Sequence, residues 1–139
     1  MNELIVKDIK VEDIIYEIRG KQVMFDSDLA KLYQCANETK DINKAVKRNL
    51  ERFPEDFYFK LTREEYNNIL KFQNGTLELK QGQYSKYLPY VFTEQGVAML
   101  ASVLRTEVAS RVSIDIMRAF IAMRKYISNE LIEKINLIN

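Results

Sequence analysis

Histidine and tryptophan are absent from the 139 residues, and cysteine, proline and glycine are scarce. Without histidine the chain lacks the commonest general base and a frequent metal ligand. The single cysteine, Cys35, cannot form an intramolecular disulfide and has no histidine to activate it as a nucleophile. The four glycines are scattered, so no phosphate-binding or dinucleotide glycine pattern is present. These absences predict a protein that is not an enzyme and needs no metal or other cofactor.

Long hydrophobic runs are also missing. No apolar segment approaches the roughly 20 residues of a membrane span, and the N-terminal MNELIVKDIKVED is too charged for a signal peptide. A lone cysteine fits a reducing compartment, so we expect a cytoplasmic protein with no membrane partner. The length and the 47% hydrophobic content predict one cored domain, which we place at residues 1–127, followed by a helical tail or the start of a linker at 128–139.

Positive charge is concentrated in one segment, although the net charge of the chain is only +1. The segment Thr39–Phe53 carries +3, which leaves −2 for the rest of the chain. Its basic residues are Lys40, Lys44, Lys47, Arg48 and Arg52. Charge focused on one element indicates a local contact with an anionic partner.

The same segment has the periodicity of an amphipathic helix. The side expected to face a core consists of Ile42, Val46, Leu50 and Phe53, with Ala45 and Asn49 beside them. The opposite side consists of Lys40, Asn43, Lys44, Lys47 and Arg48. A helix held by an apolar stripe and presenting ammonium, guanidinium and amide groups outward can enter a DNA major groove. The alternative is a surface helix whose charges are merely solvated, which a charge stripe alone would favour.

The residues before the basic segment predict a hairpin and a short helix. Alternation over residues 14–25 indicates two strands joined by a type II′ turn at Gly20-Lys21. A helix over Ser27–Tyr33 follows, and Asp26 or Ser27 can accept the free N–H groups at its start. A short helix, a polar turn and the basic helix make a helix-turn-helix arrangement, with a turn longer than the usual 3 to 4 residues.

The second half of the chain alternates between short strands and helices. We expect strands over 56–61 and 88–92, a helix from the Thr62–Glu65 capping box to Phe72, and a helix capped by Thr93. The polar stretch at 73–87 predicts a hairpin or mobile loop, in which Lys80 and Lys86 either reach phosphates as a wing would or have no special role.

A long final helix is expected over Glu107–Ile127, with two apolar stripes. The broad stripe consists of Val108, Val112, Ile116, Ala119, Phe120 and Met123, and we expect it to be buried. The narrow stripe consists of Ile114, Met117 and Ile121, and Leu131, Ile135 and Ile138 continue it into the tail. A helix that is apolar on two sides is buried or shared, so the narrow stripe supports a homodimer formed through the C-terminal helix. The predicted fold class is α+β, with an N-terminal β-hairpin, a helix-turn-helix-like helix pair, short antiparallel strands and the long C-terminal helix.

Several motifs occur in a recognisable order. They are DLAKLY (28–33), Thr39-Lys40, Ile42-Asn43, AVKRN (45–49), RFPEDF (52–57), YLPY (87–90), FTEQGVAML (92–100) and IMRAF (116–120). Together, over about Ile14 to Ile127, they resemble the ORF-six-N domain, a relative of the KilA-N and Bro-N domains of phage antirepressors and of proteins of large DNA viruses. The turn of residues 34–38 is longer than in many members.

The resemblance implies a DNA-binding α+β domain, often fused at its C-terminus to a variable domain. The positions that match the family's basic helix are Lys40, Asn43, Lys47, Arg48 and Asn49, and these are expected to face DNA. With Lys44, Arg52 and Lys86 they complete the predicted DNA-binding set.

Two functions follow. The first is a DNA-binding domain of a phage or prophage antirepressor or transcription regulator, with double-stranded DNA as its partner. The second is an interaction module that sequesters a repressor protein, using the same helix against an acidic surface and binding no DNA itself.

Overall fold

A computed structural model describes residues 5–6, 9–74 and 87–138. Its main sheet is antiparallel, with strand order β3-β4-β6-β5. The strands are β1 (Ile5–Val6) and β2 (Ile9–Lys10), which pair with each other, and β3 (Tyr16–Ile18), β4 (Lys21–Phe25), β5 (Tyr58–Lys60) and β6 (Tyr90–Thr93). The helices are α1 (Asp26–Leu32), α2 (Thr39–Arg48), α3 (Arg63–Asn74), α4 (Glu94–Leu104) and α5 (Glu107–Ile138), with short 3-10 helices η1 (Val11–Ile14) and η2 (Leu50–Arg52). The α+β class predicted from the sequence is confirmed.

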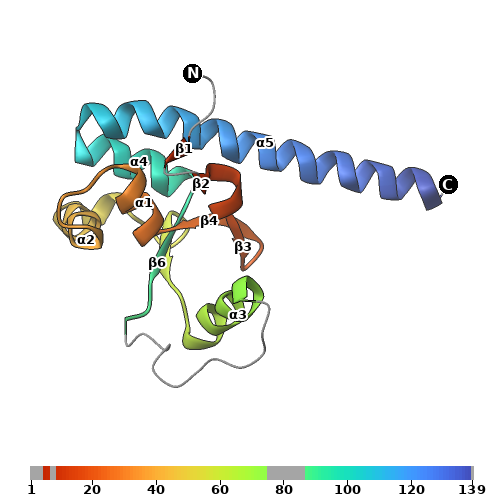
Figure 1. The fold of residues 1–139 in the computed structure, drawn as a ribbon, viewed down its shortest axis with the longest axis horizontal. Helices are drawn as coiled ribbons and strands as arrows, with labels where there is room; N and C mark the ends of the chain where they lie inside the picture. Colours follow the sequence, from red (N-terminus) through yellow and green to blue (C-terminus); the bar gives the residue numbers. More distant parts are fainter. Residues whose placement is uncertain (1–4, 7–8, 75–86, 139) are drawn as a thin grey trace.

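The main sheet separates two apolar clusters because successive side chains of a strand point to opposite faces. Met24 and Phe92, which are partners across β4 and β6, belong to the larger cluster with α1, α2, α4 and α5. Val23 and Val91 point to the other face, where Tyr66 and Ile69 of α3 cover them. Figure 1 shows α3 on one side of the sheet and the other helices opposite it.

The predicted hairpin forms, but its turn lies one residue earlier than expected. Ile18 pairs with Lys21, so the turn residues are Arg19 and Gly20, with φ of 56° and 73°. Two positive φ values define a type I′ turn, and the predicted type II′ turn at Gly20-Lys21 is wrong. The Arg19 side chain is held in place, because its guanidinium binds Glu65 (Nε–Oε2, 2.7 Å) and lies over the Phe59 ring, 4.2 Å from the centroid.

The predicted caps at Thr62 and Thr93 are confirmed. Thr62 and Glu65 exchange backbone-to-side-chain hydrogen bonds of 2.8 and 3.1 Å at the start of α3. Thr93 Oγ1 accepts from the Gly96 N–H (3.3 Å) at the start of α4. Asp26 is itself the first residue of α1, and its Oδ1 accepts from the Ser27 N–H at 2.8 Å.

The basic helix is shorter than predicted. α2 ends at Arg48, Asn49 has a non-helical φ of −134°, and the turn η2 follows. Leu50 is 56% exposed, so its predicted place on the apolar side is wrong. Phe53 is nevertheless buried, because the chain turns back towards the sheet and the Phe53 ring packs against Phe92.

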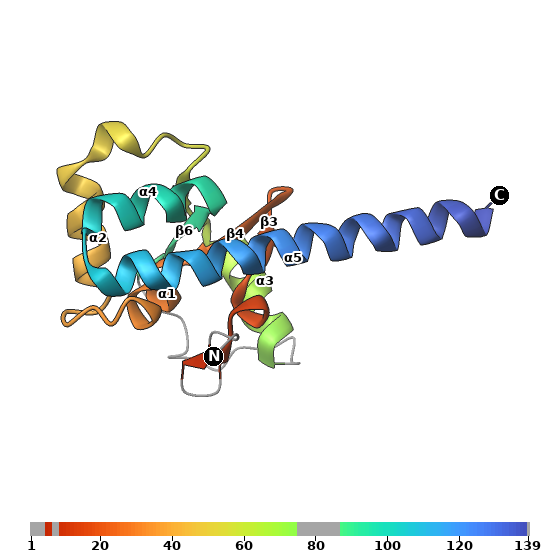
Figure 2. The same cartoon turned by 90° about the horizontal axis from the view of Figure 1, so that it is seen from above.

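The C-terminal helix continues past its predicted end at Ile127 and reaches Ile138. Its broad stripe is buried as predicted, with Ile116 and Phe120 at 0% and 1% exposure. Ile114 and Ile121 of the narrow stripe are 55% and 41% exposed. Figure 2 shows the second half of α5 projecting beyond the body, and every side chain described over 124–137 is exposed. None of the helices in the described ranges combines the length and the apolar character of a membrane span.

Candidate nucleic-acid interface

The helix α2 lies at the end of the body opposite the C-terminus (Figure 1). Ile42 and Val46 anchor it, at 0% and 3% exposure, and it packs against α1 and α4. Burying two β-branched side chains contributes on the order of 3 to 6 kcal/mol. The helix is therefore held along the side that its periodicity predicts.

The cationic side of α2 faces outward. Lys40, Lys44, Lys47 and Arg48 are exposed, and Asn43 is half-buried. Within the described part of the chain, none of these four cations belongs to an ion pair. Their charge is therefore available to a ligand, which would not have to break an internal salt bridge.

The one acid of α2, Asp41, borders the same cleft as Lys44 and Arg48. Asp41 accepts hydrogen bonds from the backbone N–H and the side-chain Nδ2 of Asn37, at 3.0 and 3.1 Å, and these bonds lower its pKa. Asn37 belongs to the six-residue connection between α1 and α2, in which Gln34 and Glu38 have positive φ. The Asp41 carboxylate, in the first turn of α2, thus binds the long connection that precedes the helix.

A buried hydrogen bond fixes the other end of this turn. The Tyr33 hydroxyl lies 2.7 Å from the Ser113 hydroxyl of α5. Burial raises the pKa of Tyr33 to about 12, so the phenol stays protonated. This hydrogen bond connects the end of α1 to α5. It thereby helps to position α1, against which α2 packs.

Asp26 is a buried acid that is linked to α2 by hydrogen bonds. The sequence identified it only as a capping residue. Asp26 is 0% exposed, and its Oδ2 accepts from the Tyr87 hydroxyl and from the Tyr90 N–H (3.2 Å). Burial raises the pKa of Asp26, and these hydrogen bonds oppose that rise. Asn43 Nδ2 in turn donates to the Tyr87 hydroxyl at 3.4 Å. The YLPY segment is thereby linked to both the core and the basic helix.

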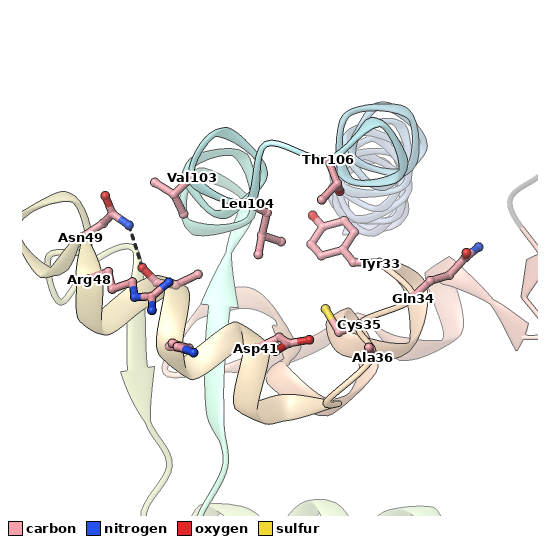
Figure 3. A pocket seen from close by; sticks show the side chains of 12 residues that line it. Tyr33, Gln34, Cys35, Ala36, Asp41, Arg48, Asn49, Val103, Leu104 and Thr106 are labelled. Atoms are coloured by element: carbon pink, nitrogen blue, oxygen red, sulfur yellow. Dashed lines mark hydrogen bonds between the residues drawn. The ribbon is translucent and has the colours of Figure 1, made fainter.

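Two clefts flank α2. The first, of about 420 Å³, has Lys44 and Arg48 on one wall and Val103 and Leu104 of α4 on the other (Figure 3). The second, of about 480 Å³, lies on the other flank and is lined by residues that include Lys40, Asn43 and Tyr87. The cations therefore border hollows on both sides of the helix.

The remaining predicted contacts lie at the edge of this surface or outside the described residues. Asn49 is half-buried, and its Nδ2 donates to the Ala45 carbonyl at 2.8 Å, which satisfies a free carbonyl at the end of α2 (Figure 3). Arg52 is exposed in η2. Lys86, Lys80 and most of the proposed wing lie outside the described residues.

These features define a small α+β domain that presents a basic helix at one end. The family model of the ORF6N domain matches residues 13–103, a range that contains the main sheet, the helices α1 to α3 and all of α4 except its last residue. The match covers more than half of the chain, which therefore belongs to the ORF6N domain family, as the motifs suggested. A search of curated proteins and a search of solved structures each found no match.

Proposed function

We propose that this chain is a DNA-binding domain of a phage or prophage antirepressor or transcription regulator, and that it acts in the cytoplasm by placing α2 on double-stranded DNA. Its role is recognition, without catalysis. The observation that carries the proposal is the exposure of Lys44, Lys47 and Arg48 on a helix whose opposite side is fully buried. Family membership supports a regulatory role, and the geometry supports the helix as the contact.

The width of a single helix allows it to enter the major groove, where cations on its flanks reach phosphates and polar groups near its centre reach base edges. On α2, Lys44 and Arg48 border one cleft, Lys40 and Asn43 border the other, and Lys47 is exposed.

Binding to random-sequence duplexes, measured by fluorescence anisotropy over a salt series, tests the proposal. The double variant Lys47→Ala, Arg48→Ala should bind more weakly and flatten the slope of log K against log salt by roughly 2, because each lost phosphate contact removes about one unit of slope. The matched control Lys21→Ala, Lys60→Ala removes the same charge from exposed sites on the sheet and should change neither quantity much.

Two results would refute DNA binding by α2. One is the absence of binding even at low salt, and the other is equal loss of affinity in both double variants. The first result would favour the alternative, a module that sequesters a repressor protein through an acidic surface, and the second would mean that DNA is held by general charge and not by α2.

We further propose that two copies associate through α5. The six apolar residues of the narrow stripe occupy positions of a heptad repeat, with alternating steps of three and four residues, whose two other positions are the polar residues Arg124 and Ser128. Such a repeat is self-complementary, so the partner that it fits is a second copy of this helix. Ile127 and Ile132 flank the repeat at the positions that meet across a parallel pair, and both are more than 40% exposed.

A parallel pair would place both α2 helices at the same end of the assembly, because α2 lies opposite the projecting end of α5 (Figure 1). Light scattering should give a dimeric mass for the wild type and a monomeric mass for Leu131→Asp, Ile135→Asp. The control Tyr126→Asp, Leu137→Asp alters exposed residues on the other side of the helix and should remain dimeric. A monomeric wild type at high micromolar concentration would refute the pairing.

A further inference from the structure

The side-chain amide of Asn43 is oriented by hydrogen bonds that begin in the protein core. The first group is the Asp26 carboxylate, which is fully buried at the start of α1. It accepts hydrogen bonds from the Ser27 N–H, the Tyr90 N–H and the Tyr87 hydroxyl. Both backbone groups can only donate, so the two carboxylate oxygens act as acceptors and fix the direction of the bonds that follow.

The donor and acceptor roles in this chain of hydrogen bonds are set first at Asp26, then at Tyr87 and finally at Asn43. A phenol has one hydrogen, and Tyr87 donates it to Asp26. The pKa of Tyr87 is raised to about 12, first by burial and then by Asp26, so the phenol keeps this hydrogen at neutral pH. Towards α2 the Tyr87 oxygen presents lone pairs, and the Asn43 group that faces it at 3.4 Å must be a donor. The NH₂ of Asn43 therefore points towards Tyr87, and Oδ1 points away from it.

Among the residues that the structure describes, two groups of Asn43 have no hydrogen-bond partner. One N–H of Nδ2 is directed to Tyr87, while the second N–H and the Oδ1 acceptor lie side by side on the planar amide. Asn43 lies on the same side of α2 as Lys40 and Lys47, and it lines the cleft that contains Lys40 and Tyr87. An adjacent donor and acceptor match the N7 acceptor and the N6 amino donor that adenine presents in the major groove.

We propose that Asn43 recognises an adenine base in the major groove, and that Tyr87 and Asp26 are positioning residues that determine which edge its amide presents. This inference rests on the proposed function, because it requires α2 to lie in the groove. It deepens that function by assigning one residue to base recognition, whereas Lys44, Lys47 and Arg48 hold phosphates.

Selection of bound sequences from randomised duplexes tests the inference. The wild type should enrich adenine at one position of its site, and Asn43→Ala should lose that enrichment. Tyr87→Phe keeps the ring and removes the hydroxyl, so it should reduce discrimination at the same position about 10-fold, within the range of one bidentate base contact. Its affinity for random duplex and its salt slope should not change, because no cation is altered.

A matched control is available in the same YLPY segment. Tyr90 reaches Asp26 through its backbone N–H and stacks on Tyr58 with its ring, so Tyr90→Phe should retain the wild-type preference. Discrimination is a ratio of two affinities measured on one preparation, and partial unfolding of Tyr87→Phe would not alter it. A structural role of Tyr87 alone would lower the active fraction and leave this ratio intact.

The possible outcomes distinguish failure of adenine recognition by Asn43 from failure of DNA binding by α2. Loss of adenine preference in Asn43→Ala and Tyr87→Phe, with retention in Tyr90→Phe, supports it. Retention of the preference in Asn43→Ala overturns the assignment of Asn43, and retention in Tyr87→Phe overturns the positioning role. If the wild type binds no duplex, the proposed function fails and the inference fails with it. Binding that Lys47→Ala, Arg48→Ala weakens, but that shows no base preference, overturns the inference alone.

Discussion

Gly96 lies in the first turn of α4, and one added methyl group there should lower the free energy of unfolding strongly. A Cβ atom built there would lie 2.0 Å from the Phe57 carbonyl oxygen and 2.9 Å from its carbon. That carbonyl is not free to move, since it accepts from the Thr93 N–H (3.0 Å) and the Thr93 hydroxyl (3.2 Å). Substitution by alanine must therefore separate the start of α4 from the segment that leads into β5.

The size of the effect follows from three contributions to the free energy of unfolding. Overpacking against a fixed backbone costs about 1–3 kcal/mol, and loss of the Thr93–Phe57 hydrogen bond costs about 1 kcal/mol. Alanine recovers up to about 1 kcal/mol through its higher helix propensity. We expect Gly96→Ala to lower the stability by roughly 1–4 kcal/mol. Because α4 packs against α2, DNA binding should fall as well.

Urea denaturation followed by circular dichroism measures this effect, with Gly20→Ala as the control. Gly20 has a φ of +73°, and a Cβ atom added there would have no neighbour within 4 Å, so alanine meets only backbone strain of about 1 kcal/mol. The explanation is wrong if Gly96→Ala is as stable as the wild type or costs less than Gly20→Ala. Either result would mean that α4 and the segment leading into β5 can separate at little cost.

Two further predictions concern an ion pair and the end of the basic helix. Hydrogen bonding to Arg19 lowers the pKa of Glu65 to about 2 from an ordinary value of 4.5, so its stabilising contribution is present above pH 4.5 and is lost as the pH falls towards 2. Denaturation at pH 7 and pH 3 should show a smaller acid-induced loss for Glu65→Gln than for the wild type, whereas Glu64→Gln, at an exposed neighbour, should behave as the wild type. Ile42→Ala should cost about 2–5 kcal/mol and Leu50→Ala less than about 0.5 kcal/mol, because Ile42 is fully buried and Leu50 lies beyond the end of α2. Equal costs in thermal unfolding would show that the helix continues through Leu50.

Much of the fold could be predicted from residues close together in the chain. The 3.6-residue period of α2 is a local property, and it correctly separated Ile42 and Val46 from the lysines. The caps at Thr62 and Thr93 are local too, since donor and acceptor lie three residues apart. Family membership was likewise readable from short motifs, and the match over residues 13–103 confirmed it.

Where an element ends was less predictable from the same patterns. The apolar period continues through Leu50 and Phe53, yet α2 stops at Arg48. Phe53 is buried by its contact with Phe92 of the central strand, a residue far away in the sequence. The hairpin turn lies one residue earlier than predicted, and there Arg19 contacts Glu65 and Phe59, which are likewise far away in the sequence.

The sequence by itself determined the helical period, the caps, the concentration of charge on one helix and the family. Only the tertiary structure decided what lies beneath that helix. Asp26 and Tyr87 are 61 positions apart, and no local pattern indicates that the carboxylate is buried or that the phenol orients Asn43. The physical reason is that periodicity and capping act over one or two turns, whereas burial of a polar group depends on which distant donors the completed fold brings to it.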